Sequence, residues 1–85
     1  MFSIHYFASI REQLGSGGET LEAAGQINTV ADLTAILAAR GGAWTLLEDR
    51  HAVLVAVDQA VADRNQALSG NEEVAFFPPM TGGWR

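Results

Sequence analysis

The 85-residue sequence contains no cysteine and no lysine. Without cysteine the chain can form no disulfide, offers no thiol nucleophile and cannot carry sulfur as a side-chain persulfide. Without lysine it can form no Schiff base, and none of its side chains can accept an isopeptide bond. These two absences exclude thiol, disulfide, Schiff-base and isopeptide chemistry on the side chains.

Positive charge and long apolar runs are also scarce. Ten acidic residues face five arginines, which gives a net charge of −5. This balance argues against nucleic acid and favours a partner with a basic surface. No apolar run approaches the roughly 18 residues of a membrane span, and the N-terminus lacks the pattern of a secretion signal. We therefore expect a soluble cytoplasmic protein with no membrane partner.

Metal chemistry is not expected either. The two histidines, His5 and His51, lie far apart in the sequence and have no clustered metal ligands around them. Glu72-Glu73 and Glu48-Asp49 are most simply solvated charges, although acids close to the C-terminal segment could orient it toward a basic partner.

Two strands are predicted in the N-terminal quarter of the chain. Alternation of Phe2, Ile4 and Tyr6 with polar residues predicts a half-buried strand over residues 2–8. Residues 10–14 form a short helical turn at best, and the glycine-rich segment 15–18 is a loop. Residues 19–24 alternate weakly and could pair with the first strand.

The best-defined element is a helix that starts at Thr29. Thr29 and Asp32 have the spacing of a capping box, and Gly41-Gly42 is a C-cap signal at the other end. Trp44 then anchors the core or the following loop. The apolar residues expected on one face of this helix are Val30, Leu33, Ile36 and Leu37.

Two further strands complete the predicted domain. Val53, Val55 and Val57 share one face of a β-rich run, and a turn at residues 69–71 precedes the strand over residues 74–77. Pro78-Pro79 ends that strand, because proline has no N–H to donate. The order of elements predicts an α+β domain in which one helix packs across one face of a small mixed sheet.

The segment that follows carries the most specific motif. It reads Glu73-Val-Ala-Phe-Phe-Pro-Pro-Met-Thr-Gly-Gly83, and it occurs with Tyr6-Phe7-Ala8, Ile10-Arg11-Glu12, a helix start at Thr29-Val30 and Val57-Asp58-Gln59. In this combination the chain resembles the MoaD proteins of the ThiS/MoaD sulfur-carrier family, the small subunits of molybdopterin synthase. The resemblance covers almost the whole chain.

The resemblance implies a ubiquitin-like β-grasp domain over residues 1–79 and a flexible tail over residues 80–85. It implies that a MoeB-like adenylyltransferase uses ATP to activate the carboxylate of Gly83, that sulfur then forms a thiocarboxylate, and that the sulfur passes to a pterin precursor in a MoaE-like large subunit. A heterotetramer with the large subunit is expected. The chain itself would bind no cofactor and would be a sulfur donor, with the catalytic groups on its partners.

The residues agree with this cycle. A carrier without cysteine can hold reactive sulfur only on its C-terminal carbonyl, and Gly82-Gly83 lets an extended backbone enter a narrow channel. Pro78 and Pro79 stiffen the exit of the tail. The residues that the resemblance assigns to partner contacts, together with the tail that would enter the partner, are Phe7, Arg11, Val61, Phe77, Pro78, Pro79, Met80 and Thr81.

Two of these contacts also follow from strand alternation. It places Phe7 and Phe77 on the outer face of the sheet, where exposed aromatic rings indicate an interface. In the competing interpretation both rings lie under loops as ordinary core. Arg11 could pair with a carboxylate of a partner, or it could cap the short helix beside it.

The sequence departs from the MoaD pattern after the second glycine, because Trp84 and Arg85 follow Gly83. A peptidase could remove both residues, they could be the remnant of a fusion, or the protein could have lost the carrier role. Our hypothesis is that activity requires their removal. The alternative functions are a sulfur carrier for thiazole, thiolated-metabolite or cysteine synthesis, and an inert β-grasp interaction module or protein tag.

Overall fold

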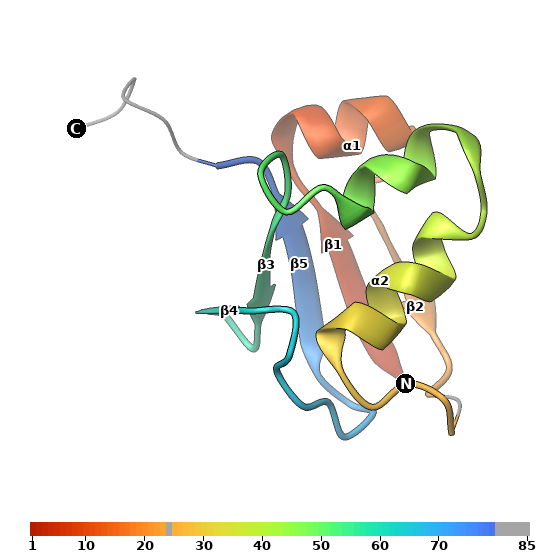
Figure 1. The fold of residues 1–85 in the computed structure, drawn as a ribbon, viewed down its shortest axis with the longest axis vertical. Helices are drawn as coiled ribbons and strands as arrows, with labels where there is room; N and C mark the ends of the chain where they lie inside the picture. The colour runs from red at the N-terminus through yellow and green to blue at the C-terminus, as the bar shows by residue number, and fades with distance from the viewer. Residues whose placement is uncertain (24, 80–85) are drawn as a thin grey trace.

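Five strands form one mixed sheet in the computed structural model, which describes residues 1–23 and 25–79 (Figure 1). The elements in chain order are β1 (Phe2–Tyr6), α1 (Ala8–Leu14), β2 (Gly18–Leu21), α2 (Val30–Ala38), the 3-10 helix η1 (Gly42–Glu48), β3 (Leu54–Val57), β4 (Ala60–Ala62) and β5 (Glu73–Phe77). The expected tail, residues 80–85, lies outside the described residues.

The strand order in the sheet is β2-β1-β5-β3-β4. The two central strands, β1 and β5, run parallel, with Ile4 opposite Val74 and Tyr6 opposite Phe76. The pairs β1–β2, β3–β5 and β3–β4 are antiparallel. The first and last strands of the described chain therefore lie side by side, and the predicted mixed sheet with one main helix is confirmed.

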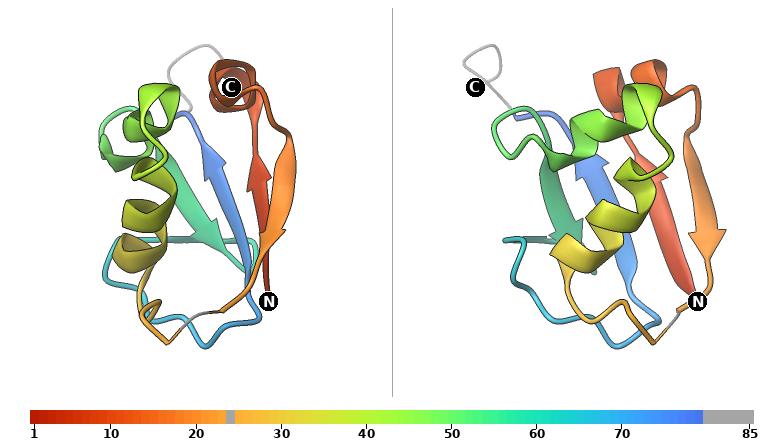
Figure 2. Two further views of the ribbon diagram at one scale, coloured as in Figure 1. Left: turned by 90° about the vertical axis from the view of Figure 1, so that its right-hand side faces the viewer. Right: turned by 45° about the vertical axis from the view of Figure 1, so that its right-hand side comes forward.

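The helices lie over one face and one end of the sheet (Figure 2). Helix α2 and η1 cover the face, and α1 sits at the end where β1 and β5 finish. The core between the layers includes Phe2, Ile4, Tyr6, Val74 and Phe76, each at most 1% exposed. Within residues 1–23 and 25–79, no helix is long and apolar enough to span a bilayer.

Helix α2 begins as predicted but ends earlier. Thr29 Oγ1 accepts from Asp32 N–H, and the Asp32 carboxylate accepts from Thr29 N–H, so the capping box is confirmed. The helix ends at Ala38 with Ala39 as its C-cap, and the predicted stop at Gly41-Gly42 is wrong. Both glycines have positive φ and instead turn the chain into η1, an element that was not predicted.

The predicted burial of Ile36 is also wrong, because this side chain is 37% exposed. The stripe that packs on the sheet follows a spacing of i, i+3, i+4, i+7 and i+8, which leaves position i+6 on the solvent side. A polar residue, Thr34, takes the place in the stripe, and its hydroxyl donates to the Val30 carbonyl at 2.8 Å. The buried residues of α2 are Val30, Leu33, Thr34, Leu37 and Ala38.

The strand and helix at the N-terminus meet earlier than predicted. Strand β1 ends at Tyr6, and α1 is a full helix of seven residues where only a short turn was expected. Ala8 has a φ of 52°, which bends the chain sharply after Phe7, and the Phe7 carbonyl then accepts from the N–H groups of Ile10 and Arg11. Strand β4 was not predicted, and the predicted second strand is shorter, over Gly18–Leu21.

A polar and aromatic cluster joins the helix layer to the edge of the sheet. Arg40 donates to both Glu19 oxygens at 2.7 and 2.8 Å, and the Tyr6 hydroxyl donates to Glu19 Oε2 at 2.9 Å. The Arg40 guanidinium lies 4.4 Å from the ring centroid of Trp44, whose ring meets Tyr6 edge-on. Trp44 therefore anchors the end of the helix layer, as predicted.

The first prediction concerns this cluster. The substitution Glu19→Gln removes the charge that pairs with Arg40, so we expect the free energy of unfolding to fall. The loss should be only about 1 to 2 kcal/mol, because the pair is partly exposed and solvent screens it. The control Glu22→Gln makes the same charge change just beyond β2 and should stay within about 0.5 kcal/mol of the parent. Urea denaturation of both variants measures the difference. Equal effects of the two substitutions would contradict a stabilising role of Glu19 in this cluster.

The second prediction concerns Tyr6, the single tyrosine of the chain. Burial, together with the hydrogen bond to Glu19, raises its pKa above the ordinary value of 10.0. Because the folded-state pKa is the higher one, the stabilisation is complete below pH 10 and is lost as the pH rises further. Phenolate absorbance should stay low in the folded protein and rise only with unfolding. Titration of Tyr6 near pH 10 in the folded protein would contradict the buried position of its hydroxyl.

Candidate functional site

The open face of the sheet carries the residues that alternate with the core. On β1 and β5, the buried positions Tyr6 and Phe76 are flanked by residues that point the other way. The register brings Gly18, His5, Ala75, Ala56 and Val61 into one row across all five strands. No helix of the described residues covers this face. It is therefore available to a partner.

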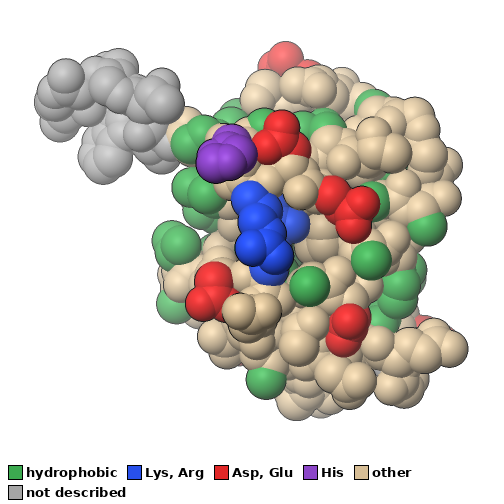
Figure 3. Space-filling view, in the orientation of Figure 1, with side chains coloured by type: hydrophobic (Ala, Val, Ile, Leu, Met, Phe, Trp, Pro, Cys, Tyr) green, Lys and Arg blue, Asp and Glu red, His purple; other side chains and the backbone are tan. Residues whose placement is uncertain are grey.

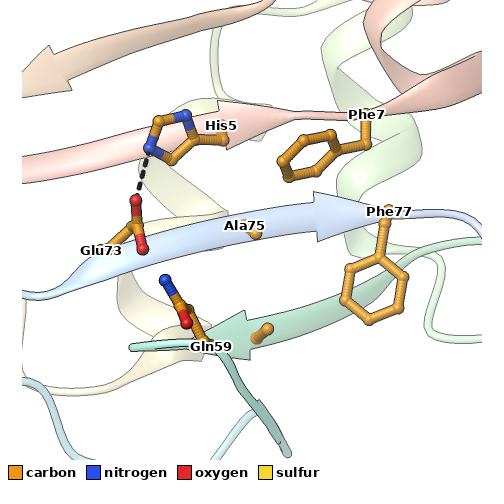
Figure 4. A pocket seen from close by; sticks show the side chains of 7 residues that line it. His5, Phe7, Gln59, Glu73, Ala75 and Phe77 are labelled. Atoms are coloured by element: carbon orange, nitrogen blue, oxygen red, sulfur yellow. Dashed lines mark ion pairs between the residues drawn. The ribbon is translucent and has the colours of Figure 1, made fainter.

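A groove of about 460 Å³ lies on this face (Figure 4). The small side chains of Ala56 and Ala75, on adjacent strands, form its floor. The rings of Phe7 and Phe77 stand at one end of the groove. The residues at the other end are polar: His5, Gln59 and Glu73.

The polar end is held by the turn between β3 and β4. Asp58 N–H donates to the Glu73 carbonyl at 2.8 Å, and the Asp58 carboxylate accepts from Glu73 N–H at 3.0 Å. His5 Nε2 lies 3.0 Å from Glu73 Oε2, but the two atoms are not aligned for a hydrogen bond. His5 Nε2 is buried and has no hydrogen-bond partner among the described residues. The polar groups at this end are thus only partly satisfied.

Backbone strain is concentrated beside the groove. The described residues other than glycine with positive φ are Ala8 at 52°, Asp58 at 50° and Gln59 at 72°. Ala8 directly follows Phe7 at the aromatic end, whereas Asp58 and Gln59 form the turn at the polar end. Left-handed backbone at a side-chain-bearing residue costs free energy, and at Asp58 and Gln59 it is the geometry that the two-residue turn between β3 and β4 requires.

The structure brings three of the predicted contact residues to this face and leaves one outside it. Phe7 is 51% exposed and Val61 is 75% exposed, while Phe77 is half-buried, so the interpretation of Phe7 as core is wrong. Arg11 is exposed on α1 and does not line the groove. It lies in the last turn of α1, where a positive charge suits the helix dipole.

The remaining predicted residues lie at the exit of β5. Pro78 and Pro79 directly follow Phe77, where the strand ends as predicted, and both are half-buried. Met80, Thr81, Gly82 and Gly83 lie outside the described residues.

Five residues of the groove were not assigned to the site from the sequence: His5, Ala56, Gln59, Glu73 and Ala75. Alternation could have placed Glu73 and Ala75 beside Phe77, because they share its parity on β5. Gln59 could not have been placed, since β4 and its two-residue turn gave no hairpin signal of the Asn-Gly type. Glu73 was interpreted as a solvated charge, and the structure instead places it at the end of the groove.

The helix-covered face has a different character (Figure 3). A basic cluster on it is flanked by acidic side chains, and hydrophobic side chains gather toward the edge beside β3 and β4. The large hydrophobic side chains that the described residues expose are Met1, Phe7, Ile36 and Val61. Within residues 1–23 and 25–79 there is no cluster of three metal-ligating side chains.

Comparison with known proteins relates the chain to one family. The ThiS family model matches residues 4–83. The sequence is 36% identical to the molybdopterin synthase sulfur carrier subunit of Escherichia coli and 34% identical to that of Haemophilus influenzae. Each match spans 83 residues, which are 98% of this chain and 100% of the relative.

The fold is similar to a solved β-grasp structure. SAMP1 (small archaeal modifier protein 1) of Haloferax volcanii superposes with a TM-score of 0.72 at 26% identity, over 96% of this chain and 98% of that one. The expected ubiquitin-like β-grasp fold is thereby confirmed.

The third prediction tests whether Phe7 belongs to the surface. The substitution Phe7→Ala should change the free energy of unfolding by less than about 1 kcal/mol, because the ring is half-exposed. The matched change Phe76→Ala, on the neighbouring strand, should cost about 3 to 5 kcal/mol because that ring is fully buried. Chemical denaturation compares the two, and a Phe7 cost close to that of Phe76 would make Phe7 a core residue.

Proposed function

We propose that this chain, which belongs to the ThiS family, is the sulfur carrier subunit of a molybdopterin synthase. The observation that carries the proposal is the extent of the family match, which runs through the whole β-grasp domain and stops at Gly83. Both full-length relatives above 30% identity have that role in their names. The absence of cysteine agrees, since the sulfur would be held on the backbone carbonyl of Gly83.

The proposed chemistry takes place at the carboxylate of Gly83. A MoeB-like adenylyltransferase joins this carboxylate to the AMP part of ATP and releases pyrophosphate. Sulfide supplied by a sulfur donor then attacks the activated carbonyl carbon, AMP leaves, and a thiocarboxylate remains. The thiocarboxylate gives its sulfur to the pterin precursor, and water restores the carboxylate. Glycine at positions 82 and 83 allows close approach of the partner's groups to this carbonyl.

Trp84 and Arg85 are incompatible with this chemistry while they remain attached, because the Gly83 carbonyl is then part of a peptide bond. The family match also excludes both residues. We therefore infer that a peptidase removes them before activation. A bulky indole next to the glycine pair would also hinder entry of the tail into a channel.

The partners would dock on the open sheet face and at the exit of β5. Phe7, Phe77 and Val61 offer apolar surface there, and Arg11 offers a charge beside it on α1. Pro78 and Pro79 restrict the backbone at the base of the tail. Met80 and Thr81 would enter the partner with the glycine pair. We propose a MoaE-like large subunit as the main partner, in a heterotetramer of two copies of each chain.

A second candidate function is that of a protein modifier. The likeness to the archaeal modifier protein favours it, since it covers nearly all of both chains. A modifier would join Gly83 to lysine side chains of other proteins and produce a ladder of adducts on a denaturing gel. A carrier for another sulfur pathway would load in the same way but would not bind a MoaE-like subunit.

The fourth prediction tests sulfur loading. With ATP, a MoeB-like enzyme and a sulfur donor, the chain processed to Gly83 should gain the mass of one oxygen-to-sulfur exchange. The full 85-residue chain should not change mass, because its Gly83 carboxylate is not free. Intact-mass spectrometry measures both forms.

The form processed to Gly83 and then shortened by one glycine is the matched control and should load poorly, because the terminal carbonyl moves back along the tail. Loading of the full chain would refute the requirement for processing. Failure of the processed chain to load under conditions that load a known carrier would refute the carrier role.

A further inference from the structure

The groove on the open sheet face is amphipathic along its length. Phe77 and Glu73 lie on the same side of β5 at opposite ends of the groove, four residues or about 14 Å apart. Ala75 lies between them, with Ala56 beside it, and these small side chains leave open space at the bottom of the groove. An occupant that fills the groove must therefore be apolar along one part and polar at the other.

The acidic end differs from two other acidic sites of the chain, at Glu72 and Glu19. The Glu72 carboxylate accepts hydrogen bonds from four donors, and the Glu19 carboxylate accepts from Tyr6 and Arg40. The Glu73 carboxylate accepts no hydrogen bond within residues 1–23 and 25–79. It lies 3.0 Å from His5 Nε2, with which it forms an ion pair only when His5 is protonated, and the Gln59 amide points toward it (Figure 4). Its side chain is 42% exposed toward the groove. Its carboxylate oxygens can therefore accept hydrogen bonds from a partner.

The strained turn supports the same assignment. Gln59 has a φ of 72° and extends its amide toward Glu73 from the opposite wall (Figure 4). A glycine would occupy this backbone conformation at lower cost. The two-residue turn between β3 and β4 requires this conformation. It places the Gln59 amide beside Glu73, where an amide can orient a donor that enters the groove.

From these observations we propose that the groove binds a basic side chain of the protein partner, with its apolar stem against Phe7 and Phe77 and its charged head on Glu73. Lysine and arginine are the side chains that combine a long apolar stem with a cationic head. Arginine suits the site best, because its planar guanidinium can donate two parallel hydrogen bonds to the Glu73 carboxylate while its stem lies toward the rings. The net charge of −5 favours such a partner. The identity of the partner rests on the proposed function.

The test compares Glu73→Gln with Glu22→Gln, which makes the same charge change beyond β2, at the far end of the sheet from Phe7. Calorimetry at low and high salt measures the affinity for the large subunit of molybdopterin synthase. The chain used is the processed form, residues 1–83. We expect Glu73→Gln to weaken binding at least tenfold and to flatten the salt dependence. Glu22→Gln should stay within twofold. Both variants should fold, because neither side chain makes a hydrogen bond in the described structure.

A double-mutant cycle then tests whether one side chain spans both ends. If it does, Glu73→Gln and Phe7→Ala together should weaken binding by clearly less than the product of their separate effects. Independent effects, or Glu73→Gln matching Glu22→Gln, would overturn the inference while leaving the carrier role intact. A parent chain that loads no sulfur and does not bind the large subunit would instead overturn the proposed function.

Discussion

The structure depends on the burial of every second side chain of β1 and β5 against the helix layer. Ile4, Tyr6, Val74 and Phe76 fill the centre of the core, and parallel pairing of the two strands keeps them in register. A slip of one residue would turn all of them to solvent, so the register is strongly fixed. The same constraint determines the other face, because the intervening residues must point away from the helices. The groove is thus a direct consequence of the core.

The polar interactions divide into those that hold the fold and those that remain available. Arg64 is only 7% exposed, and its guanidinium donates to the carbonyls of Leu47 and Val53 at 2.8 and 2.9 Å, which joins η1 to the residue before β3. Burial lowers the pKa of Arg64. Burial alone would raise the pKa of Glu72, but hydrogen bonds from Ser69, Gly70 and its own N–H outweigh this and lower it to about 2. These groups are satisfied internally. Glu73 is the carboxylate that faces the groove without a donor.

Sequence periodicity predicted which side chains of the regular strands point into the core and which point outward. The alternation in residues 2–7 and 73–77 placed both the core rings and the outward rings, since period 2 fixes the two faces together. The capping box located the start of α2 because its two reciprocal hydrogen bonds are local. The glycine pair Gly82-Gly83 could be interpreted only through the motif around it, because a glycine pair has no chemistry of its own.

The remaining features depend on tertiary contacts or on strained backbone. Strand β4 has three residues, too few for a periodic signal, and it exists because Asp58 and Gln59 adopt positive φ. The start of α1 depends on Ala8 in the same way. Ile36 was placed in the core because spacing alone cannot distinguish it from Thr34, which is buried with its hydroxyl bonded to the helix backbone. The groove required β4, so its polar end could not be assembled from the sequence.

The central claim is that the face of the sheet without helices is the docking face. Hydroxyl-radical footprinting of the chain alone and bound to the large synthase subunit tests it directly, because three exposed apolar side chains report on the two faces. Phe7 and Val61 lie on the open face, and Ile36 lies on α2. The account predicts that binding protects Phe7 and Val61 and leaves Ile36 unchanged. Protection of Ile36 with continued labelling of Phe7 and Val61 would contradict it.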